Sequence, residues 1–168
     1  DITVPPHERL DMNGRFRLRD VVEKQQNGQY FERLLDDITK AKSTIHIETF
    51  VWWNVDICDR LAAALAQRAR DGIEVRFLID YSGSSRAKHR HEMIKSLREA
   101  GCEAHLFHPL RINNVGRMNN RTHRKIAVFD GRIAYIGGHG IAEEWTGRGE
   151  DRTHWRDTHA RMEGPVDG

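Results

Sequence analysis

Cysteine is scarce in this chain. Cys58 and Cys102 are the only two among 168 residues, and they match neither a C-x-x-C motif nor the spacing of zinc ligands. A disulfide scaffold is not expected in a chain of this length. We therefore expect both cysteines to be small buried hydrophobic side chains.

Long hydrophobic runs and an excess of one charge are also missing. No apolar segment reaches the roughly 18 residues of a membrane-spanning helix, and no signal peptide is recognisable, so we expect a soluble chain. The 27 Lys and Arg residues nearly balance the 25 Asp and Glu residues, with a formal net charge of +2. The overall charge thus gives no argument for a nucleic-acid or acidic-membrane partner, and only a local cluster could do so.

Metal-ligand patterns are a third absence. The ten histidines include no H-E-x-x-H motif and no Cys/His series. The pairs of His89 with His91 and of His105 with His108 are weak candidates. We expect neither a metal nor another cofactor.

The hydrophobic spacing alternates repeatedly between helical and strand-like periods. A length of 168 residues fits one domain, residues 1–168, with a polar N-terminal arm at 1–14. The chain starts at Asp1 rather than Met, and we expect it to be part of a longer protein. The spacing predicts helices at 30–38, 56–71 and 86–100, and strands at 44–53, 73–79 and 102–107. Such strand-helix-strand units indicate an α/β fold with parallel pairing.

A polar segment at 108–122 follows these units. It contains Arg111, Arg117 and Arg121 among four asparagines, which predicts an irregular loop. Loops of this length are uncommon in compact domains and often functional, although a solvated connection is the alternative. Together with Arg124, these arginines could attract phosphate headgroups or a nucleic-acid backbone, or they are dispersed surface charge.

The segment at 123–130 reads H-R-K-I-A-V-F-D and runs into an Asp130–Gly131 pair flanked by β-prone residues. Such a pair is among the strongest sequence signals for a hairpin with a two-residue turn. This turn would pair Phe129 with Arg132, Ala127 with Ala134, Lys125 with Ile136, and His123 with Gly138. Because side chains alternate along a strand, His123 and Lys125 would share one face. Asp130 would lie at the far end of the hairpin.

The pairing of His123 with Lys125 favours phosphoryl chemistry. An imidazole can act as a nucleophile or proton carrier near neutral pH, and an ammonium group can hold an anionic oxygen. Glycine inside a strand often marks the close approach of a ligand. A phosphate-sized group could therefore sit over Gly138.

These residues resemble the H-x-K-x4-D motif of the phospholipase D superfamily, which His123, Lys125 and Asp130 satisfy and which Gly137–Gly138 follow. Further segments are similar to the bacterial cardiolipin-synthase branch: I-H-I-E-T-F-V-W at 45–52, I-A-E-E-W at 141–145, W-R-D at 155–157 and E-G-P-V at 163–166. The resemblance spans about 15–166. It implies a phospholipase D-like mixed sheet with helices on both faces and a C-terminal β-hairpin that carries the motif.

The resemblance also implies phosphodiester chemistry without a metal. His123 would attack phosphorus to form a covalent phosphohistidine, Lys125 would bind phosphate oxygens, and Asp157 would hold the imidazole in its reactive tautomer. A second histidine would protonate the leaving alcohol. The substrate-binding candidates are Gly138, His139, Glu48 and Arg121, and the structural motif residues are Asp130, Gly131 and Gly137. For Glu48, support of the sheet and contact with Lys125 or the substrate both stay open.

Two features depart from the family pattern. Gly140 stands where the family has an asparagine, so a side-chain amide is missing, and whether His139 compensates stays open. The family builds its site from two motif copies, whereas H-R-H at 89–91 and H-A-R at 159–161 lack the second lysine. We expect the other half from a C-terminal repeat of the same polypeptide rather than from an identical chain across a two-fold axis.

The leading hypothesis is therefore a cardiolipin-synthase-like phosphatidyltransferase or phospholipase D-type half-domain. Its substrate would be an anionic phospholipid, at the cytoplasmic side of the membrane in the parent protein. A homodimeric phosphodiesterase is the first alternative, with nucleic acid as the less favoured partner. A non-catalytic phosphate-binding module is the second, supported by Gly140 and by the single motif.

Overall fold

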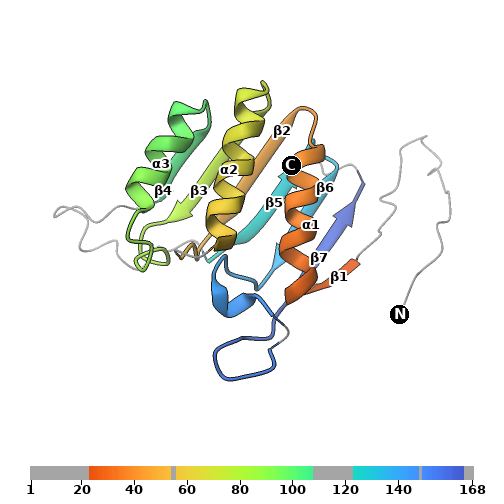
Figure 1. The fold of residues 1–168 in the computed structure, drawn as a ribbon. Helices are drawn as coiled ribbons and strands as arrows, with labels where there is room; N and C mark the ends of the chain where they lie inside the picture. The colour runs from red at the N-terminus through yellow and green to blue at the C-terminus, as the bar shows by residue number, and fades with distance from the viewer. Residues whose placement is uncertain (1–22, 54–55, 108–122, 148, 165–168) are drawn as a thin grey trace, which may run out of the picture.

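The fold is a mixed seven-stranded sheet covered by three helices, as seen in a computed structural model that describes residues 23–53, 56–107, 123–147 and 149–164 (Figure 1). The strand order is β1-β7-β6-β5-β2-β3-β4. The strands are β1 Glu23–Gln26, β2 Thr44–Thr49, β3 Glu74–Asp80, β4 Glu103–Phe107, β5 Lys125–Phe129, β6 Ile133–Gly137 and β7 Thr158–Glu163. The helices are α1 Asn27–Lys40, α2 Asp56–Arg70 and α3 Arg90–Glu99, with a 3₁₀ turn at Glu143–Trp145.

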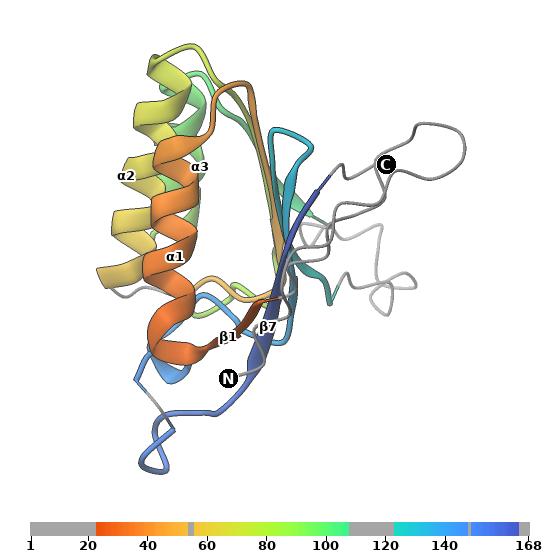
Figure 2. The ribbon, with the colours of Figure 1, turned by 90° about the vertical axis from the view of Figure 1, so that its right-hand side faces the viewer.

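All three helices lie on one face of the sheet (Figure 2). Strands β2, β3 and β4 are parallel, and four antiparallel pairings between β1 and β2 make β1 parallel to them as well. The crossovers through α1, α2 and α3 therefore run in the same direction across the sheet, and right-handed crossovers then place their helices on the same side. The predicted α/β class with a mixed sheet is confirmed, whereas the expectation of helices on both faces is wrong for the described residues.

The hydrophobic core lies between this helical layer and the sheet. Strand β2 alternates, so that Ile45 and Ile47 are buried toward the helices. Leu61 and Leu65 of α2 are at most 1% exposed, and complete burial of such a side chain stabilises a fold by about 1.5–3 kcal/mol. Cys58 and Cys102 are buried as predicted. Among the described residues, no helix is long and apolar enough to cross a membrane.

The hairpin between β5 and β6 turns at Asp130 and Gly131 as predicted, but three residues rather than two connect its strands, and its register differs. Asp130 and Gly131 adopt φ angles of 54° and 60°, and the Arg132 amide donates to the Phe129 carbonyl at 2.9 Å. Arg132 is nevertheless an extra residue, because Phe129 pairs with Ile133. The predicted register is therefore wrong by one residue.

Asp130 joins this hairpin to the loop between α1 and β2. Its carboxylate accepts hydrogen bonds from the backbone amides of Lys42, Ser43 and Thr44, at 2.7–3.1 Å. Burial alone would raise the pKa of Asp130, but these hydrogen bonds to the charged form outweigh it and lower the pKa to about 2. Asp130 and Gly131 thus have the structural place expected for them, at the end of β5 away from His123.

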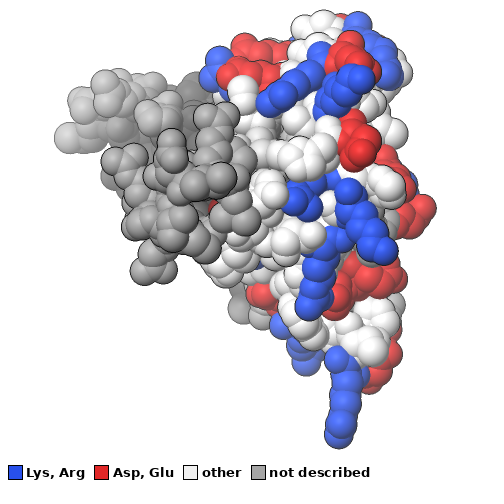
Figure 3. Space-filling view, turned by 90° about the vertical axis from the view of Figure 1, so that its left-hand side faces the viewer, with Lys and Arg blue, Asp and Glu red and all other residues white. Residues whose placement is uncertain are grey.

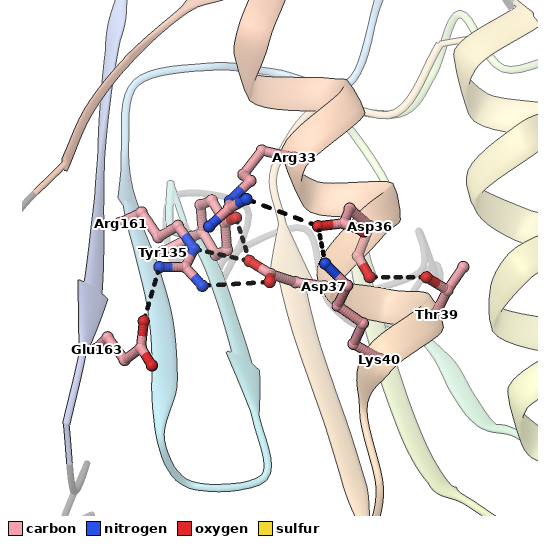
Figure 4. A network of polar contacts seen from close by, with 8 residues as sticks. All are labelled: Arg33, Asp36, Asp37, Thr39, Lys40, Tyr135, Arg161 and Glu163. Carbon is pink, nitrogen blue, oxygen red and sulfur yellow. Dashed lines mark hydrogen bonds and ion pairs between the residues drawn. The ribbon is translucent and has the colours of Figure 1, made fainter.

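A buried ion pair fixes α1 over β6 and β7 (Figure 4). Arg161 donates to both carboxylate oxygens of Asp37, at 2.8 and 3.2 Å, and each side chain is only 3% exposed. The Tyr135 hydroxyl donates to the same carboxylate at 2.5 Å. Removal of one member, or a shift of α1 that separates them, would leave a buried charge without its partner. The network therefore restricts where α1 can lie on the sheet.

Candidate functional site

The site lies at the edge of the sheet where β2 ends and β5 begins, since Thr49 pairs with Lys125. Strand β6 ends at the same edge with Gly137. Ligands of open α/β sheets bind at the carboxyl ends of the parallel strands. The topology therefore brings His123, Lys125 and Gly138 to the edge that is best suited to a ligand.

His123 and Lys125 are in direct contact. The Lys125 Nζ atom lies 3.3 Å from His123 Nδ1 and 3.3 Å from the His123 carbonyl oxygen. The imidazole packs on the Phe50 ring, with centroids 4.7 Å apart. His123 is exposed, whereas Lys125 is buried, so the imidazole faces solvent above an ammonium group held at a fixed distance.

Burial lowers the pKa of the Lys125 ammonium group, and the negative charge of Asp157 opposes this shift. An ammonium group only donates hydrogen bonds, so in this arrangement His123 Nδ1 accepts and the imidazole proton is on Nε2. Asp157 was predicted to hold the imidazole of His123 in its reactive tautomer. In the structure Lys125 is the group beside His123 Nδ1, and the charge of Asp157 acts on Lys125.

The carboxylate of Asp157 packs over Gly138. A Cβ atom on Gly138 would lie 2.2 Å from Asp157 Oδ1, so any side chain there would displace the carboxylate. The Thr158 amide donates to Oδ1 at 2.7 Å, and Trp145 Nε1 lies 3.5 Å from Oδ2. Gly138 was predicted to admit a phosphate-sized group, and the group that makes this close approach is a carboxylate of the same chain.

Gly137 and Gly140 are equally constrained by neighbours. A Cβ atom on Gly137 would lie 2.4 Å from the Thr158 carbonyl oxygen. One on Gly140 would lie 2.8 Å from the Trp145 ring and 2.9 Å from Val51 Cβ. An asparagine side chain would not fit at Gly140 without movement of these residues, so the departure from the family pattern is part of the packing.

His139 was predicted to bind substrate, but its side chain is fully buried. It lies beside His159 and under Tyr30, with His139 Nδ1 2.9 Å from His159 Nδ1. Burial, which outweighs the charge of Asp157, lowers the pKa of His139 to about 4. This burial gives no support to the substrate-binding role, which stays a prediction.

Glu48 lies on the opposite face of the sheet from Lys125. Its neighbour Thr49 pairs with Lys125 and is buried toward the helices, so alternation directs Glu48 away from them. Its carboxylate is 3.7 Å from Arg124 and lines a depression of about 330 Å³ together with His46, Arg76, Glu103 and His105. Of the two alternatives, support of the sheet is the one that this geometry favours, and contact with Lys125 is not observed.

Charge is otherwise mixed on the face shown in Figure 3. In Figure 3, Lys and Arg side chains lie among Asp and Glu side chains. Arg76 on this part of the sheet pairs with Glu74 at 2.8 Å and with Glu103 at 3.2 Å. Arg121, with Arg111 and Arg117, lies outside the described residues.

The residues that sequence reasoning missed are His159, Trp145 and Phe50. His159 was considered only as part of a failed motif search, although its place two residues after Asp157 and its strand alternation with Arg161 were readable. Within the part of the chain that the structure describes, no group of three or more His, Cys, Asp or Glu side chains could hold a metal ion. The chemistry available here is that of an imidazole, an ammonium group and a carboxylate.

Comparison with known proteins agrees with this geometry. Residues 34–151 match the family model described as cardiolipin synthase, PLD-like domain. The chain is 38% identical over 135 residues to the major cardiolipin synthase ClsA of Bacillus subtilis, and 40% identical over 134 residues to a cardiolipin synthase of Oceanobacillus iheyensis. In both cases the match covers 80% of this chain, and the chain spans only 28% of the relative's length.

Solved structures share the fold at low sequence identity. The phospholipase D family member Nuc from Salmonella typhimurium superposes with a TM-score of 0.64 at 15% identity, covering 88% of this chain and 85% of Nuc. The phosphatidylserine synthase of Haemophilus influenzae gives 0.63 at 15% identity, covering 86% of this chain and 33% of that protein. The motif, the fold and the family match agree, and the chain belongs to the family of cardiolipin synthase phospholipase D-like domains.

Proposed function

We propose that this chain is one phospholipase D-like domain that forms half of the active site of a cardiolipin-synthase-type phosphatidyltransferase. The observation that carries the proposal is the contact of an exposed His123 with a buried Lys125 at the ligand-binding edge of the sheet, 3.3 Å between Nδ1 and Nζ. The names of the sequence relatives support the transfer of a phosphatidyl group over other phosphodiester chemistry.

In the proposed reaction, His123 attacks the phosphorus of an anionic phospholipid. The P–N bond forms as the P–O bond to the headgroup alcohol breaks, which gives a phosphatidyl-histidine. A histidine of the second half gives its proton to the leaving alkoxide. The hydroxyl of an acceptor alcohol then attacks phosphorus, loses its proton to that histidine and releases His123.

Lys125 and Asp157 prepare His123 for this attack. The ammonium group of Lys125 is drawn to the non-bridging phosphate oxygens, where it stabilises the charge of the transition state. When Lys125 moves toward the phosphate, His123 Nδ1 becomes free to bind a carboxylate. We assign this role to Asp157, because its charge already acts on Lys125. The ring proton, which is on Nε2 while Lys125 donates to Nδ1, must then exchange through solvent to Nδ1, where Asp157 accepts its hydrogen bond. The Nε2 lone pair is then free to attack.

The second half would come from the rest of a longer protein. The chain contains one H-x-K-x4-D motif and spans 28% of the length of its curated relatives, which leaves room for another domain of this size in proteins like them. Because the substrate is a lipid, the assembled site must work at a membrane surface, and we expect the cytoplasmic one.

Covalent labelling tests the nucleophile. Protein with both halves is mixed with phosphatidylglycerol that carries a radiolabelled acyl chain and is quenched with denaturant. Label on the wild type and none on His123→Ala supports the proposal, and retained label on His123→Ala contradicts it. The matched control is His105→Ala, because His105 is an exposed histidine on another strand, with its side chain 56% exposed.

Gly140 favours a second candidate, a phosphate-binding half that performs no chemistry. The space for the family's asparagine is filled by Trp145 and Val51. This candidate predicts that protein with both halves binds inorganic phosphate without acquiring label from phosphatidylglycerol. Cleavage of single-stranded DNA by the same preparation would instead point to a nuclease.

A further inference from the structure

Two histidines outside the motif, His139 and His159, form a pair beneath α1. Both side chains are fully buried. The Tyr30 ring stacks on both imidazoles, with centroid distances of 4.8 and 4.3 Å and interplanar angles of 21° and 16°. Phosphoryl transfer as proposed above uses neither of them, so the presence of two polar rings in the core needs another explanation.

The hydrogen bonds of the pair determine both tautomers. His159 Nε2 lies 3.4 Å from the Lys125 carbonyl oxygen, which can only accept, so the proton of His159 is on Nε2. His159 Nδ1 is left as an acceptor, and the His139 amide donates to it at 3.3 Å. His139 Nδ1 is 2.9 Å from the same atom and must therefore donate to it. The pair is His139 Nδ1–H with His159 Nε2–H.

Both imidazoles are neutral in this arrangement. A second proton on His159 Nδ1 would point at two hydrogen-bond donors of His139, its backbone amide and its Nδ1–H, in a buried environment where such a contact is unfavourable. Burial is the main cause that lowers the pKa of His159 to about 3 and that of His139 to about 4. A group that stays neutral and is shielded by Tyr30 cannot protonate a leaving alcohol at neutral pH, so neither histidine replaces the one that the second half must supply.

The pair instead joins three segments of the candidate site. His159 holds the carbonyl group of Lys125 at the start of β5. His139 directly follows Gly138, over which Asp157 packs. His159 lies on β7, two residues after Asp157, which directly precedes that strand. These are the segments that carry the ammonium group, the glycine and the carboxylate.

We propose that His139 and His159 are positioning residues, which hold Lys125 and Asp157 in the relative placement that the site requires. This proposal rests on the function proposed above, but it makes a claim about the resting protein that needs no turnover. The mechanism is indirect, because both imidazoles act through backbone groups and touch no substrate.

Imidazole ¹⁵N NMR of the wild-type chain is the first test. We expect His159 to show the Nε2–H tautomer and His139 the Nδ1–H tautomer, both unchanged between pH 8 and pH 5. Titration of either ring in this range, or the opposite tautomer, overturns the proposal whether or not the protein proves to be a phosphatidyltransferase.

Variants of His159 are the second test. His159→Phe keeps a ring under Tyr30 and removes all three hydrogen bonds of the imidazole, and His159→Gln restores a donor and an acceptor. In His159→Phe we expect the pKa of Lys125, followed by NMR of ¹³C-lysine, to move toward its ordinary value. In protein with both halves, kcat should fall by at least about tenfold with KM little changed, because a displacement of about 1 Å can reduce rates severely. His159→Gln should recover part of both.

Tyr135→Phe is the matched control, because it removes a buried hydrogen bond under the same helix without touching Lys125. It should lower the melting temperature and leave the pKa of Lys125 unchanged. If His159→Phe folds and leaves the pKa of Lys125 as in the wild type, the positioning role is wrong. If it does not fold, the comparison of His159→Gln with Tyr135→Phe decides in the same way.

Discussion

The two halves of the helix-sheet interface are built differently. Under α2 and α3 the contact is apolar, with Leu65, Phe77 and Leu97 at most 2% exposed. Under α1 lie Arg161 and His159 of β7 and His139 just after β6, all at most 3% exposed. Apolar side chains tolerate small shifts, whereas buried polar groups require defined partners. The half that adjoins the candidate site is thus the one in which polar contacts specify the position of each strand.

Arg161→Met should give the largest effect. Loss of the guanidinium group leaves the Asp37 carboxylate buried, so the free energy of unfolding should fall by about 3–5 kcal/mol. Urea unfolding measures it. The double variant Arg161→Met with Asp37→Leu should recover much of the loss. Leu65→Ala in the apolar half should cost about 2–5 kcal/mol, with no second change that rescues it. If the second substitution did not restore stability to Arg161→Met, the two halves of the interface would respond alike and the contrast between them would be wrong.

Lys125→Met separates chemistry from stability at the polar edge. Loss of the positive charge that meets the phosphate should lower kcat by about 100- to 1000-fold in protein with both halves. Because burial lowers the pKa of Lys125, the ammonium group is held at a cost, and the melting temperature of the variant should not fall. A large drop in melting temperature with little change in kcat would make Lys125 a structural residue.

Asp130→Asn should have a moderate, pH-dependent effect. The pKa of Asp130 is about 2 in the folded protein and about 3.9 in an unfolded chain, so its stabilisation is present above pH 4 and is lost as the pH falls toward 2. At pH 7 the variant should be less stable by about 1–2 kcal/mol. The difference in free energy of unfolding between variant and wild type should disappear between pH 4 and pH 2. A difference that does not depend on pH would contradict the assigned hydrogen bonds.

Glu48→Gln should have the smallest effect. Glu48 faces away from Lys125, its side chain is partly exposed, and its ion pair with Arg124 is long at 3.7 Å, while Gln keeps the size and the hydrogen-bonding capacity of the side chain. Stability should change by less than about 0.5 kcal/mol, and kcat should stay within about twofold. A severe loss of kcat with normal stability would show that Glu48 reaches the substrate after all.

The sequence predicted the local parts of this site well. The Asp130–Gly131 turn and the shared face of His123 and Lys125 depend on turn chemistry and on strand alternation, which are local. The register failed by one residue, and the extra residue, Arg132, accepts a hydrogen bond from the amide of Gly164 just after β7, a segment distant in the chain. Likewise α3 begins at Arg90 rather than near Arg86, since Gly83 and Ser84 are held in turns against Trp53 and Phe50.

The long-range parts could not be predicted. Whether Glu48 and Lys125 lie on the same face of the sheet depends on the pairing of Thr49 with Lys125. No local pattern determines that pairing. The contact of His139 with His159 depends in turn on β6 lying beside β7. The family resemblance named the reacting groups, but not the buried polar contacts that position them.

The most direct test of the central claim is peptide mapping of the covalent intermediate. Protein with both halves is mixed with phosphatidylglycerol, quenched within the first turnover, digested and analysed by mass spectrometry. We predict a phosphatidyl adduct on His123 and none on His139 or His159. An adduct on either buried histidine, or turnover without an adduct on His123, would contradict the account.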